Sequence, residues 1–259
     1  MENFYINKVA KLIKTCYNIK TMKILREFLQ ERINKKYLSD IEVTFKKYRD
    51  FLQYWNENKS NLTRITNFDD VEIKHFIDSL TAIEFIPKKA KVLDVGSGAG
   101  FPGLPIKIVR DDLDVTLIDS VKKKVDFMNE LISLLSLDNV VAKHTRIEDI
   151  EEKNSFDVVV SRAVAPLPTL MEYCLPFVKK QGLFIAYKSV NVDDEIKESQ
   201  NALKVLNGEI EQVKKFELKI KYNSGESESN KRALIIVRKN ELTPNMYPRK
   251  KNLPRTKPL

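Results

Sequence analysis

Cysteine and histidine are scarce in this chain of 259 residues, which excludes several kinds of site. The two cysteines, Cys16 and Cys174, lie far apart, and the two histidines are His75 and His144. These residues cannot supply four ligands at zinc-finger spacing, so we expect no metal site. So little cysteine is typical of a reduced protein, and we expect a cytoplasmic location.

Long hydrophobic runs are also absent. The most apolar stretch near the N-terminus, residues 9–13, is interrupted by Lys11 and followed by Lys14, so we expect no signal peptide. No run approaches the roughly 18 apolar residues that a membrane-spanning helix needs. We therefore expect no membrane association. A chain of this length can bury enough surface to fold without disulfides.

The surplus of positive charge lies at the two ends of the chain. Residues 1–60 carry 13 basic and 7 acidic side chains, and residues 191–259 carry 15 and 10. Residues 91–190 carry 13 and 14 and are nearly neutral. This distribution is typical of a core domain with polyanion-binding margins. A general lysine-rich bias would give the same numbers, and composition alone does not separate the two interpretations.

Hydrophobic periodicity divides the chain into four predicted segments. They are a basic helical extension (1–38), two helices that pack on the core (39–88), an α/β domain (89–240) and a basic C-terminal tail (241–259). Ser39 and Glu42 have the spacing of a capping box at the start of the first packing helix. The second packing helix covers about residues 69–85, and Pro87 ends it.

In residues 89–240, short apolar segments alternate with helical patterns. The predicted strands are 91–95, 115–118, 140–143, 157–160, 182–187, 209–220 and 232–238, and the predicted helices are 104–109, 121–135, 166–178 and 193–206. This alternation is typical of a parallel sheet covered on both faces. We therefore predict an α/β fold with a doubly wound, mostly parallel sheet, preceded by a helical segment.

The clearest chemical signal is a glycine-rich turn between the first strand and the first helix of this domain. It reads Asp94-Val-Gly96-Ser-Gly98-Ala-Gly100-Phe-Pro-Gly103. Glycines at such a turn let the backbone bend sharply and let a ligand approach closely. Gly98, Gly100 and Gly103 match the dinucleotide pattern, whereas Asp94, Gly96, Gly98 and Gly100 match the pattern of S-adenosylmethionine enzymes.

The register favours S-adenosylmethionine over NAD, because Gly96 follows the strand directly. Asp119 ends the second strand, 23 residues after Gly96. A carboxylate at that position accepts hydrogen bonds from ribose hydroxyls in either class of enzyme, so it does not discriminate between them. A glycine-rich turn without a ligand is the third interpretation.

The end of the fourth strand, where methyltransferases carry their reaction-specific residues, reads Ser161-Arg162-Ala163. It has neither the Asn/Asp-Pro-Pro-Tyr/Phe sequence of amine methylation nor the Pro-Cys nucleophile of carbon methylation. Arg162 is a permanent cation that suits a carboxylate, a phosphate or guanine O6, and a structural salt bridge is its alternative role. Cations without a base suit a nucleophile with a free lone pair, such as guanine N7.

Together these segments resemble the bacterial small-subunit ribosomal RNA guanine-N7 methyltransferases, the RsmG or GidB family. The resemblance extends from about Phe51 to Leu259. Its most specific parts are Gly-x-Gly-Phe-Pro-Gly-x-Pro within residues 93–105 and Ser-Arg-Ala within residues 160–163. Shorter matching segments are 61–63, 75–80, 117–120, 146–148, 247–249 and 257–259.

The resemblance implies a Rossmann-like class I methyltransferase fold over residues 89–240, with S-adenosylmethionine as cofactor. It implies a guanosine of 16S rRNA near the decoding region as the target, in free rRNA or the small ribosomal subunit, and we expect a monomer. The implied cofactor-binding residues are Gly96, Gly98, Phe101, Asp119, Ile147, Glu148 and Arg162. Ile147 and Glu148 would border the adenine and Asp119 the ribose, and Arg162 would also be the catalytic residue beside the guanine.

The C-terminal tail is the predicted RNA-binding element. Its candidate residues are Arg249, Lys250, Lys251 and Arg255, and its prolines favour an extended chain that can follow phosphates. Tyr247 could stack on a base, whereas a disordered basic tail is the alternative. For His75, a core or capping role is favoured over catalysis.

Two other functions stay open at this point. One is a methyltransferase of another substrate class. The other is a non-enzymatic RNA-binding ribosome assembly factor that has kept the fold.

Overall fold

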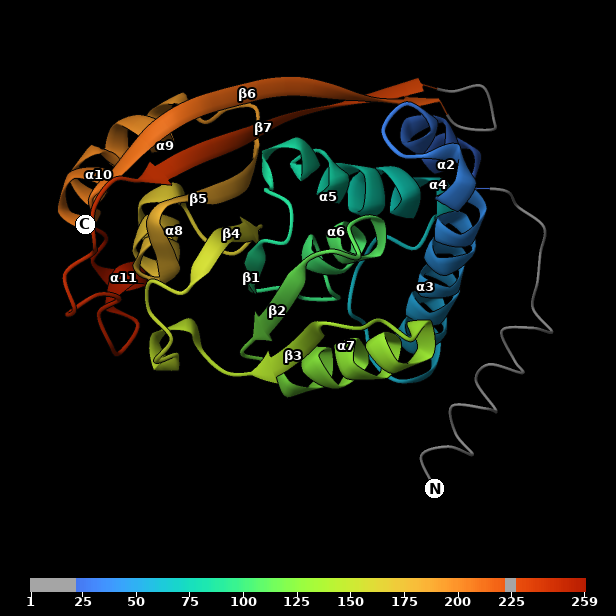
Figure 1. Cartoon of the computed structure of the whole chain (residues 1–259), viewed down its shortest axis with the longest axis horizontal. Helices are drawn as coiled ribbons and strands as arrows, with labels where there is room; N and C mark the ends of the chain where they lie inside the picture. The colour runs from blue at the N-terminus through green and yellow to red at the C-terminus, as the bar shows by residue number, and fades with distance from the viewer. Residues whose placement is uncertain (1–21, 222–226) are drawn as a thin grey trace.

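The computed structural model describes residues 22–221 and 227–259 (Figure 1). In this part of the chain, seven strands form one sheet in the order β3-β2-β1-β4-β5-β7-β6. The strands are β1 (Lys91–Val95), β2 (Asp114–Asp119), β3 (Val140–His144), β4 (Phe156–Arg162), β5 (Val178–Ser189), β6 (Gly208–Lys221) and β7 (Ser227–Lys239). All pairs from β3 to β5 are parallel, and β7 is antiparallel to both β5 and β6. The predicted α/β fold with a mostly parallel sheet is confirmed.

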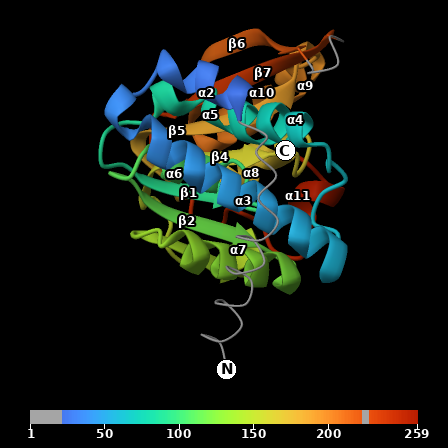
Figure 2. The same cartoon turned by 90° about the vertical axis from the view of Figure 1, so that its right-hand side faces the viewer.

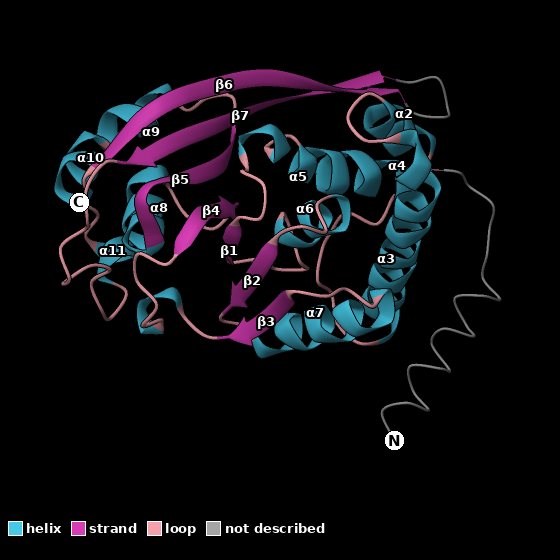
Figure 3. Ribbon diagram, viewed as in Figure 1, coloured by secondary structure: helices cyan, strands magenta, loops and turns pink. Residues whose placement is uncertain are grey.

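Both faces of the sheet are buried because successive side chains of a strand point to opposite sides. On β1, Val92 packs into one hydrophobic core, and Leu93 and Val95 pack into the other. One face is covered by α2 (Lys23–Gln30), α3 (Leu38–Asn58), α4 (Phe68–Asp70), η2 (Val71–Ile77), α5 (Asp78–Leu80), η3 (Ile83–Phe85), α6 (Gly103–Val109) and α7 (Lys122–Leu135). The other face is covered by α8 (Leu167–Cys174), η5 (Leu175–Phe177), α9 (Asp193–Glu198) and α10 (Gln200–Leu206) (Figure 3). In Figure 2 the strands lie above one another from β6 to β2, and α3 crosses in front of them.

Helix α3 begins one residue before the predicted capping box. A short turn, η1 (Lys35–Tyr37), leads directly into it, and the N–H of Leu38 donates to the carbonyl of Lys35. Tyr37 is the N-cap, and no side chain caps this helix. The predicted capping box at Ser39 is therefore wrong, because backbone carbonyls of η1 already occupy that role. Phe45, Tyr48, Phe51, Leu52 and Trp55 of this helix are buried.

The second predicted helix, residues 69–85, is divided among α4, η2, α5 and η3. The middle part, η2, is a π-helix, and the N–H of Asp78 donates to the carbonyl of Ile73 five residues earlier. Such widened turns occur frequently at functional sites. Here the π-helix carries Lys74 and His75 to the edge of a cavity. Its apolar side chains, among them Ile73 and Phe76, are buried.

Other predicted elements differ in their bounds, and β5 begins at Val178, four residues before the predicted strand. The helix predicted over 193–206 is interrupted at Ser199, between α9 and α10. The tail folds into turns and the short helix α11 (Leu253–Thr256). The helical pattern predicted for residues 1–21 lies outside the described residues. None of the helices within residues 22–221 and 227–259 is long and apolar enough to span a membrane.

The strand order reverses between β1 and β4. The chain runs outward from β1 through β2 to β3, and then returns to form β4 on the other side of β1. In open α/β sheets, ligands bind in the crevice outside the carboxyl ends of the strands at such a point. Gly96 follows β1, Asp119 ends β2 and Arg162 ends β4. The topology therefore brings three predicted site residues to one edge of the sheet.

Candidate active site

Two adjoining cavities lie at this edge. The first has a volume of about 290 Å³ and is lined by Gly96, Asp119, Ile147 and Glu148 among others; it is called the acidic cavity below. The second has a volume of about 440 Å³ and is lined by Gly98, His75, Asp78, Phe101, Arg162 and Arg232 among others; it is called the arginine cavity. Gly96, Lys124 and Ala163 border both cavities, so the two are neighbours.

The glycine-rich turn forms part of the wall of both cavities. Gly96 and Gly98 have φ angles of +74° and +60°, which residues other than glycine rarely adopt. A Cβ atom on Gly96 would lie 2.3 Å from Cγ2 of Val164, whereas a Cβ atom on Gly98 would meet no atom within 4 Å. The turn therefore keeps backbone close to the cavities and leaves open space beside Gly98.

Asp119 is held in the acidic cavity by backbone donors. Its Oδ2 accepts a hydrogen bond from the N–H of Gly98 at 2.9 Å, and its Oδ1 accepts one from the N–H of Val121 at 2.9 Å. Oδ2 also lies 3.4 Å from Nζ of Lys124, so Oδ1 is the oxygen that keeps a lone pair for a further donor. A ribose hydroxyl is a donor of this kind. The orientation of Asp119 therefore suits the predicted ribose contact.

The rest of the acidic cavity combines a second acid with an apolar wall. Glu148 and Ile147 belong to the short turn η4 (Ile147–Asp149) and are both largely buried. An apolar side chain suits the face of a purine, and a carboxylate accepts hydrogen bonds from hydroxyl or amino groups. The residues present thus fit an adenosyl group. Across residues 22–221 and 227–259, no cluster of three His, Cys, Asp or Glu side chains could hold a metal ion.

Asp94 holds the glycine-rich turn in place through a hydrogen bond to its last glycine. Its carboxylate Oδ2 accepts a hydrogen bond from the N–H of Gly103 at 2.8 Å, which joins β1 to the start of α6. Its Oδ1 is buried and has no hydrogen-bond partner among the described residues. Burial raises the pKa of Asp94 from 3.8 to about 7. This residue is therefore a structural acid beneath the turn.

Arg162 lies in the arginine cavity and is fixed by several acceptors. Its NH1 donates to Oδ2 of Asp78 at 2.8 Å and to the carbonyls of Lys74 and His75 at 3.2 and 3.4 Å. The guanidinium carbon lies 5.1 Å from the centre of the Phe101 ring. Arg162 thus has both features considered from the sequence, a salt bridge and a place in the cleft.

His75 and Phe101 form a stacked pair beside Arg162. Their ring centres are 4.4 Å apart with an angle of 14° between the planes, and Nε2 of His75 is 3.0 Å from Oγ1 of Thr63. Tyr48 also stacks on Phe101, with ring centres 5.3 Å apart. Burial, and then the charge of Arg162, lowers the pKa of His75 to about 3. The histidine is neutral at physiological pH and serves packing, as the sequence favoured.

The C-terminal tail folds back against α8. Arg249 makes a two-pronged ion pair with Glu172, at 2.8 Å from Nε to Oε1 and 2.6 Å from NH2 to Oε2. Glu172 is fully buried. Tyr247 is also buried, and Oγ1 of Thr169 donates to the carbonyl of Pro254 at 2.9 Å. The prediction of an extended tail with an exposed, stacking Tyr247 is therefore wrong. The carboxylate of Glu172 holds Arg249, and Tyr247 packs into the hydrophobic core on the α8 side of the sheet.

The other predicted RNA-binding residues lie around the acidic cavity or on the surface. Lys250 donates to the carbonyl of Glu148 and pairs with Asp149 at 3.1 Å. Arg255 lines the acidic cavity, and its NH2 donates to the carbonyl of Val164 at 2.9 Å. Lys251 is exposed. The tail therefore contributes one wall of the acidic cavity, a role that the sequence did not suggest.

Sequence reasoning placed Asp78 near the cofactor but did not predict its partners, and it missed Arg232 and Tyr48 as site residues. Asp78 pairs with Arg162, and Arg232 of β7 pairs with the same carboxylate. Tyr48 of α3 donates its hydroxyl to the carbonyl of Ala99 in the glycine-rich turn. Asp78 belongs to a segment that carries the family resemblance, which is a usable signal. Arg232 and Tyr48 look like an exposed strand cation and a helix core residue, and nothing local distinguishes them.

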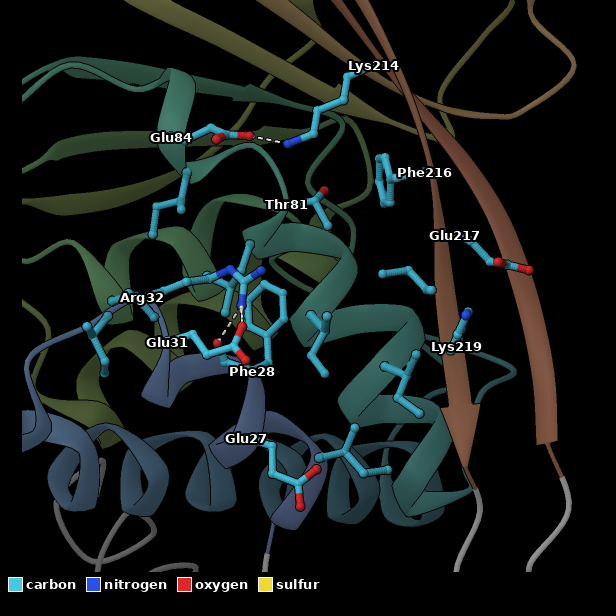
Figure 4. Close-up of a pocket in the computed structure, with 18 of the residues that line it drawn as sticks. Glu27, Phe28, Glu31, Arg32, Thr81, Glu84, Lys214, Phe216, Glu217 and Lys219 are labelled. Carbon is cyan, nitrogen blue, oxygen red and sulfur yellow. Dashed lines mark hydrogen bonds and ion pairs between the residues drawn. The ribbon is translucent and has the colours of Figure 1, made fainter.

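A larger cavity of about 1080 Å³ lies elsewhere, between α2, α5 and β6. Figure 4 shows Phe28 and Phe216 among its labelled residues and the ion pair between Glu84 and Lys214 at one side. Its lining includes none of the predicted site residues and no part of the glycine-rich turn. Size alone therefore does not identify the site. The topological switch point and the glycine-rich turn do.

The chain is similar to known proteins over most of its length. The family model described as rRNA small subunit methyltransferase G matches residues 41–223. Ribosomal RNA small subunit methyltransferase G of Desulforamulus reducens is 46% identical over 223 residues, covering 84% of this chain and 90% of that protein. The protein of the same name from Clostridium kluyveri is 42% identical over 238 residues, covering 90% of this chain and 92% of that protein.

Solved structures agree on the fold. M. jannaschii TYW2, crystallised in complex with AdoMet, superposes with a TM-score of 0.51 at 18% identity, over 63% of this chain and 75% of that one. The YcgJ protein of Bacillus subtilis superposes with a TM-score of 0.50 at 15% identity, over 64% of this chain and all of that one. At these identities the likeness concerns the fold alone. Because the family model and these relatives match most of its length, the chain belongs to the rRNA small subunit methyltransferase G family.

Proposed function

We propose that this chain methylates N7 of a guanosine in 16S rRNA near the decoding region, with S-adenosylmethionine as the methyl donor. The observation that carries the proposal is the pair of adjoining cavities. The acidic cavity suits an adenosyl group, and the arginine cavity offers guanidinium donors to a base. Gly96 and Ala163 border both, so a donor in one cavity and an acceptor in the other meet at the glycine-rich turn.

In the proposed complex, Asp119 accepts hydrogen bonds from the ribose, Ile147 and Glu148 border the adenine, and Gly96 lets the backbone approach the ligand. Bound S-adenosylmethionine supplies an electrophilic methyl group on its sulfonium. Gly98 and Phe101 line the arginine cavity, where Phe101 supports Arg162. The part of these residues is to hold the reactants in contact and in line.

Arg162 is the proposed catalytic residue. Its guanidinium can donate to O6 or to other acceptors of the guanine without taking part in proton transfer. Methylation of N7 releases no proton from N7, so no general base is needed. The groups beside Arg162 agree with this chemistry, since the lowered pKa of His75, about 3, makes it a weak base, and Asp78 is occupied by two guanidinium groups. Catalysis would then rest on positioning.

We also propose that the basic tail, including Arg249, Lys250, Lys251 and Arg255, and the N-terminal helices border the bound RNA. We also propose that the protein acts as a monomer. We further propose that the protein works in the cytoplasm, on 16S rRNA or the small subunit, and uses no metal.

The test is methyl transfer from labelled S-adenosylmethionine to small-subunit particles, followed by nucleoside analysis. We expect 7-methylguanosine, and a fall of about 100-fold in turnover for Arg162→Ala. Arg238→Met, on the far end of β7, is the matched control and should stay active. Cofactor binding without labelled rRNA would reject the substrate and favour another substrate class. Binding of rRNA without binding of cofactor would favour an assembly factor.

A further inference from the structure

Asp78 joins two arginines that come from distant parts of the chain. Arg232 of β7 forms a fork with its carboxylate, with Nε 2.9 Å from Oδ1 and NH2 2.9 Å from Oδ2. Arg162 of β4 adds NH1 at 2.8 Å from Oδ2. Asp78 is buried at the start of α5, directly after the π-helix. One carboxylate therefore holds both guanidinium groups in fixed positions.

The charges of this cluster do not cancel. Two permanent cations share one carboxylate, and burial keeps the neighbouring His75 neutral. The nearby Lys74 pairs with Asp70 at 2.9 Å. The arginine cavity therefore keeps a net positive charge, although Asp78 lies within it. Such a site favours an anion or an oxygen acceptor.

The two arginines differ in depth. The side chain of Arg162 is 9% exposed and lies beside the ring of Phe101, whereas that of Arg232 is 24% exposed. Both line the arginine cavity. Within residues 22–221 and 227–259, NH1 of Arg232 donates no hydrogen bond to a protein group, while Nε and NH2 are occupied by Asp78. The two N–H bonds of NH1 are therefore free to bind a ligand, and Asp78 holds the Arg232 side chain in a fixed position nearer to solvent.

Resting on the proposed function, we propose that Arg232 binds a backbone phosphate of the RNA beside the target guanosine. Asp78 is then a positioning residue, which sets the separation between the arginine on the phosphate and Arg162 on the base. The outer position and the permanent charge of Arg232 suit a phosphate, because phosphates lie outside the base and attract guanidinium groups strongly.

Salt dependence measures the phosphate contact directly. Each phosphate contact that is lost reduces the slope of log affinity against log salt by about 0.7–0.9. For Arg232→Met we expect a KM for small-subunit particles that is at least fivefold higher at low salt. The slope of log affinity against log salt should fall by the amount that corresponds to about one phosphate contact. Binding of S-adenosylmethionine should be unchanged. Arg238→Met is the matched control, because Arg238 lies on the same strand and also pairs with an acid, Glu211.

Two further variants test position against charge. Arg232→Lys keeps the charge but cannot form the fork with Asp78, so it should keep the salt slope and lose turnover. Arg232→Gln removes the charge but keeps one donor for Asp78, and it should lose the slope as the Met variant does. If Arg232→Met does not fold, the salt slope of Arg232→Gln shows whether Arg232 contacts a phosphate. A slope equal to that of Arg238→Met in the folded neutral variant would overturn the proposal. A lower turnover with an unchanged slope would assign Arg232 to the base and also overturn it.

The positioning role of Asp78 has its own readout. Asp78→Asn should lower kcat about tenfold with unchanged cofactor binding, since two unscreened guanidinium groups repel each other, and Asp78→Glu should restore part of kcat. A lower melting temperature with unchanged kcat would show a merely structural acid. If the wild-type protein and the Arg238→Met control both fail to methylate rRNA, the proposed function itself fails. Activity in both with no effect at Arg232 or Asp78 rejects this inference alone.

Discussion

Asp94 is a buried acid whose charge has little compensation, and this predicts an unusual effect of its substitution. One of its oxygens accepts the N–H of Gly103, and the other has no hydrogen-bond partner among the described residues. Asp94→Asn has nearly the same shape and keeps an acceptor for Gly103. It resembles the protonated form of the wild-type residue. We therefore expect the neutral variant to be more stable than the wild type at neutral and alkaline pH.

The sign and size follow from the pKa. Burial raises the pKa of Asp94 from 3.8 to about 7 in the folded chain. Between these values the folded state keeps a proton that the unfolded state has lost, so stability falls as pH rises. The contribution is fully present below about pH 4 and has been lost by about pH 8. The total loss is roughly 4 kcal/mol, since each pKa unit corresponds to about 1.4 kcal/mol.

The assay is urea unfolding of the wild type and Asp94→Asn at several pH values from 5 to 8. Relative to the variant, the wild type should lose about 2.5 kcal/mol of unfolding free energy over this range. Asp138→Asn, at an exposed acid, is the control and should follow the wild type. A variant less stable than the wild type by the same amount at every pH would refute the reasoning. It would mean that Asp94 is ionised and stabilised in the fold.

Three further predictions concern the surroundings of the cavities. Gly96→Ala places a Cβ atom 2.3 Å from Cγ2 of Val164, at a φ of +74°, so calorimetry should show at least tenfold weaker S-adenosylmethionine binding; unchanged affinity would contradict the proposed position of the cofactor. Tyr48→Phe removes the hydroxyl that donates to the carbonyl of Ala99, and thermal unfolding should report a loss of about 1 kcal/mol. Glu172→Gln removes a buried carboxylate that holds the tail, so unfolding free energy should fall by roughly 3 kcal/mol. Carboxypeptidase should then shorten the tail faster, and equal rates would count against that anchor.

Predictions from local pattern succeeded where a residue's environment follows from its neighbours in sequence. The first strand was predicted over residues 91–95, and β1 has these bounds. The later strands were found within a few residues because apolar runs buried on both faces leave a continuous signal. The glycine-rich turn was placed correctly because its glycines directly follow the first strand in the chain.

Predictions failed where the partner is distant in sequence. The tail was expected to be extended, yet Arg249 finds the carboxylate of Glu172, 77 residues away. For the tail, a contact made only in the folded chain decided the outcome. The capping box at Ser39 failed for a local reason, because the turn η1 directly before the helix supplies backbone carbonyls there.

The sequence by itself therefore determined the alternation of strands and helices, the glycine-rich turn and the family, because these depend on short-range patterns. Only the tertiary structure decided which charges meet. Asp78, Arg162 and Arg232 lie on three elements, and their carboxylate and guanidinium groups come within hydrogen-bond distance through the order of strands in the sheet. Charged side chains carry no directional pattern along the chain, and their energy depends on burial and on distances between atoms. For this reason the site's electrostatics become visible only once the chain is folded.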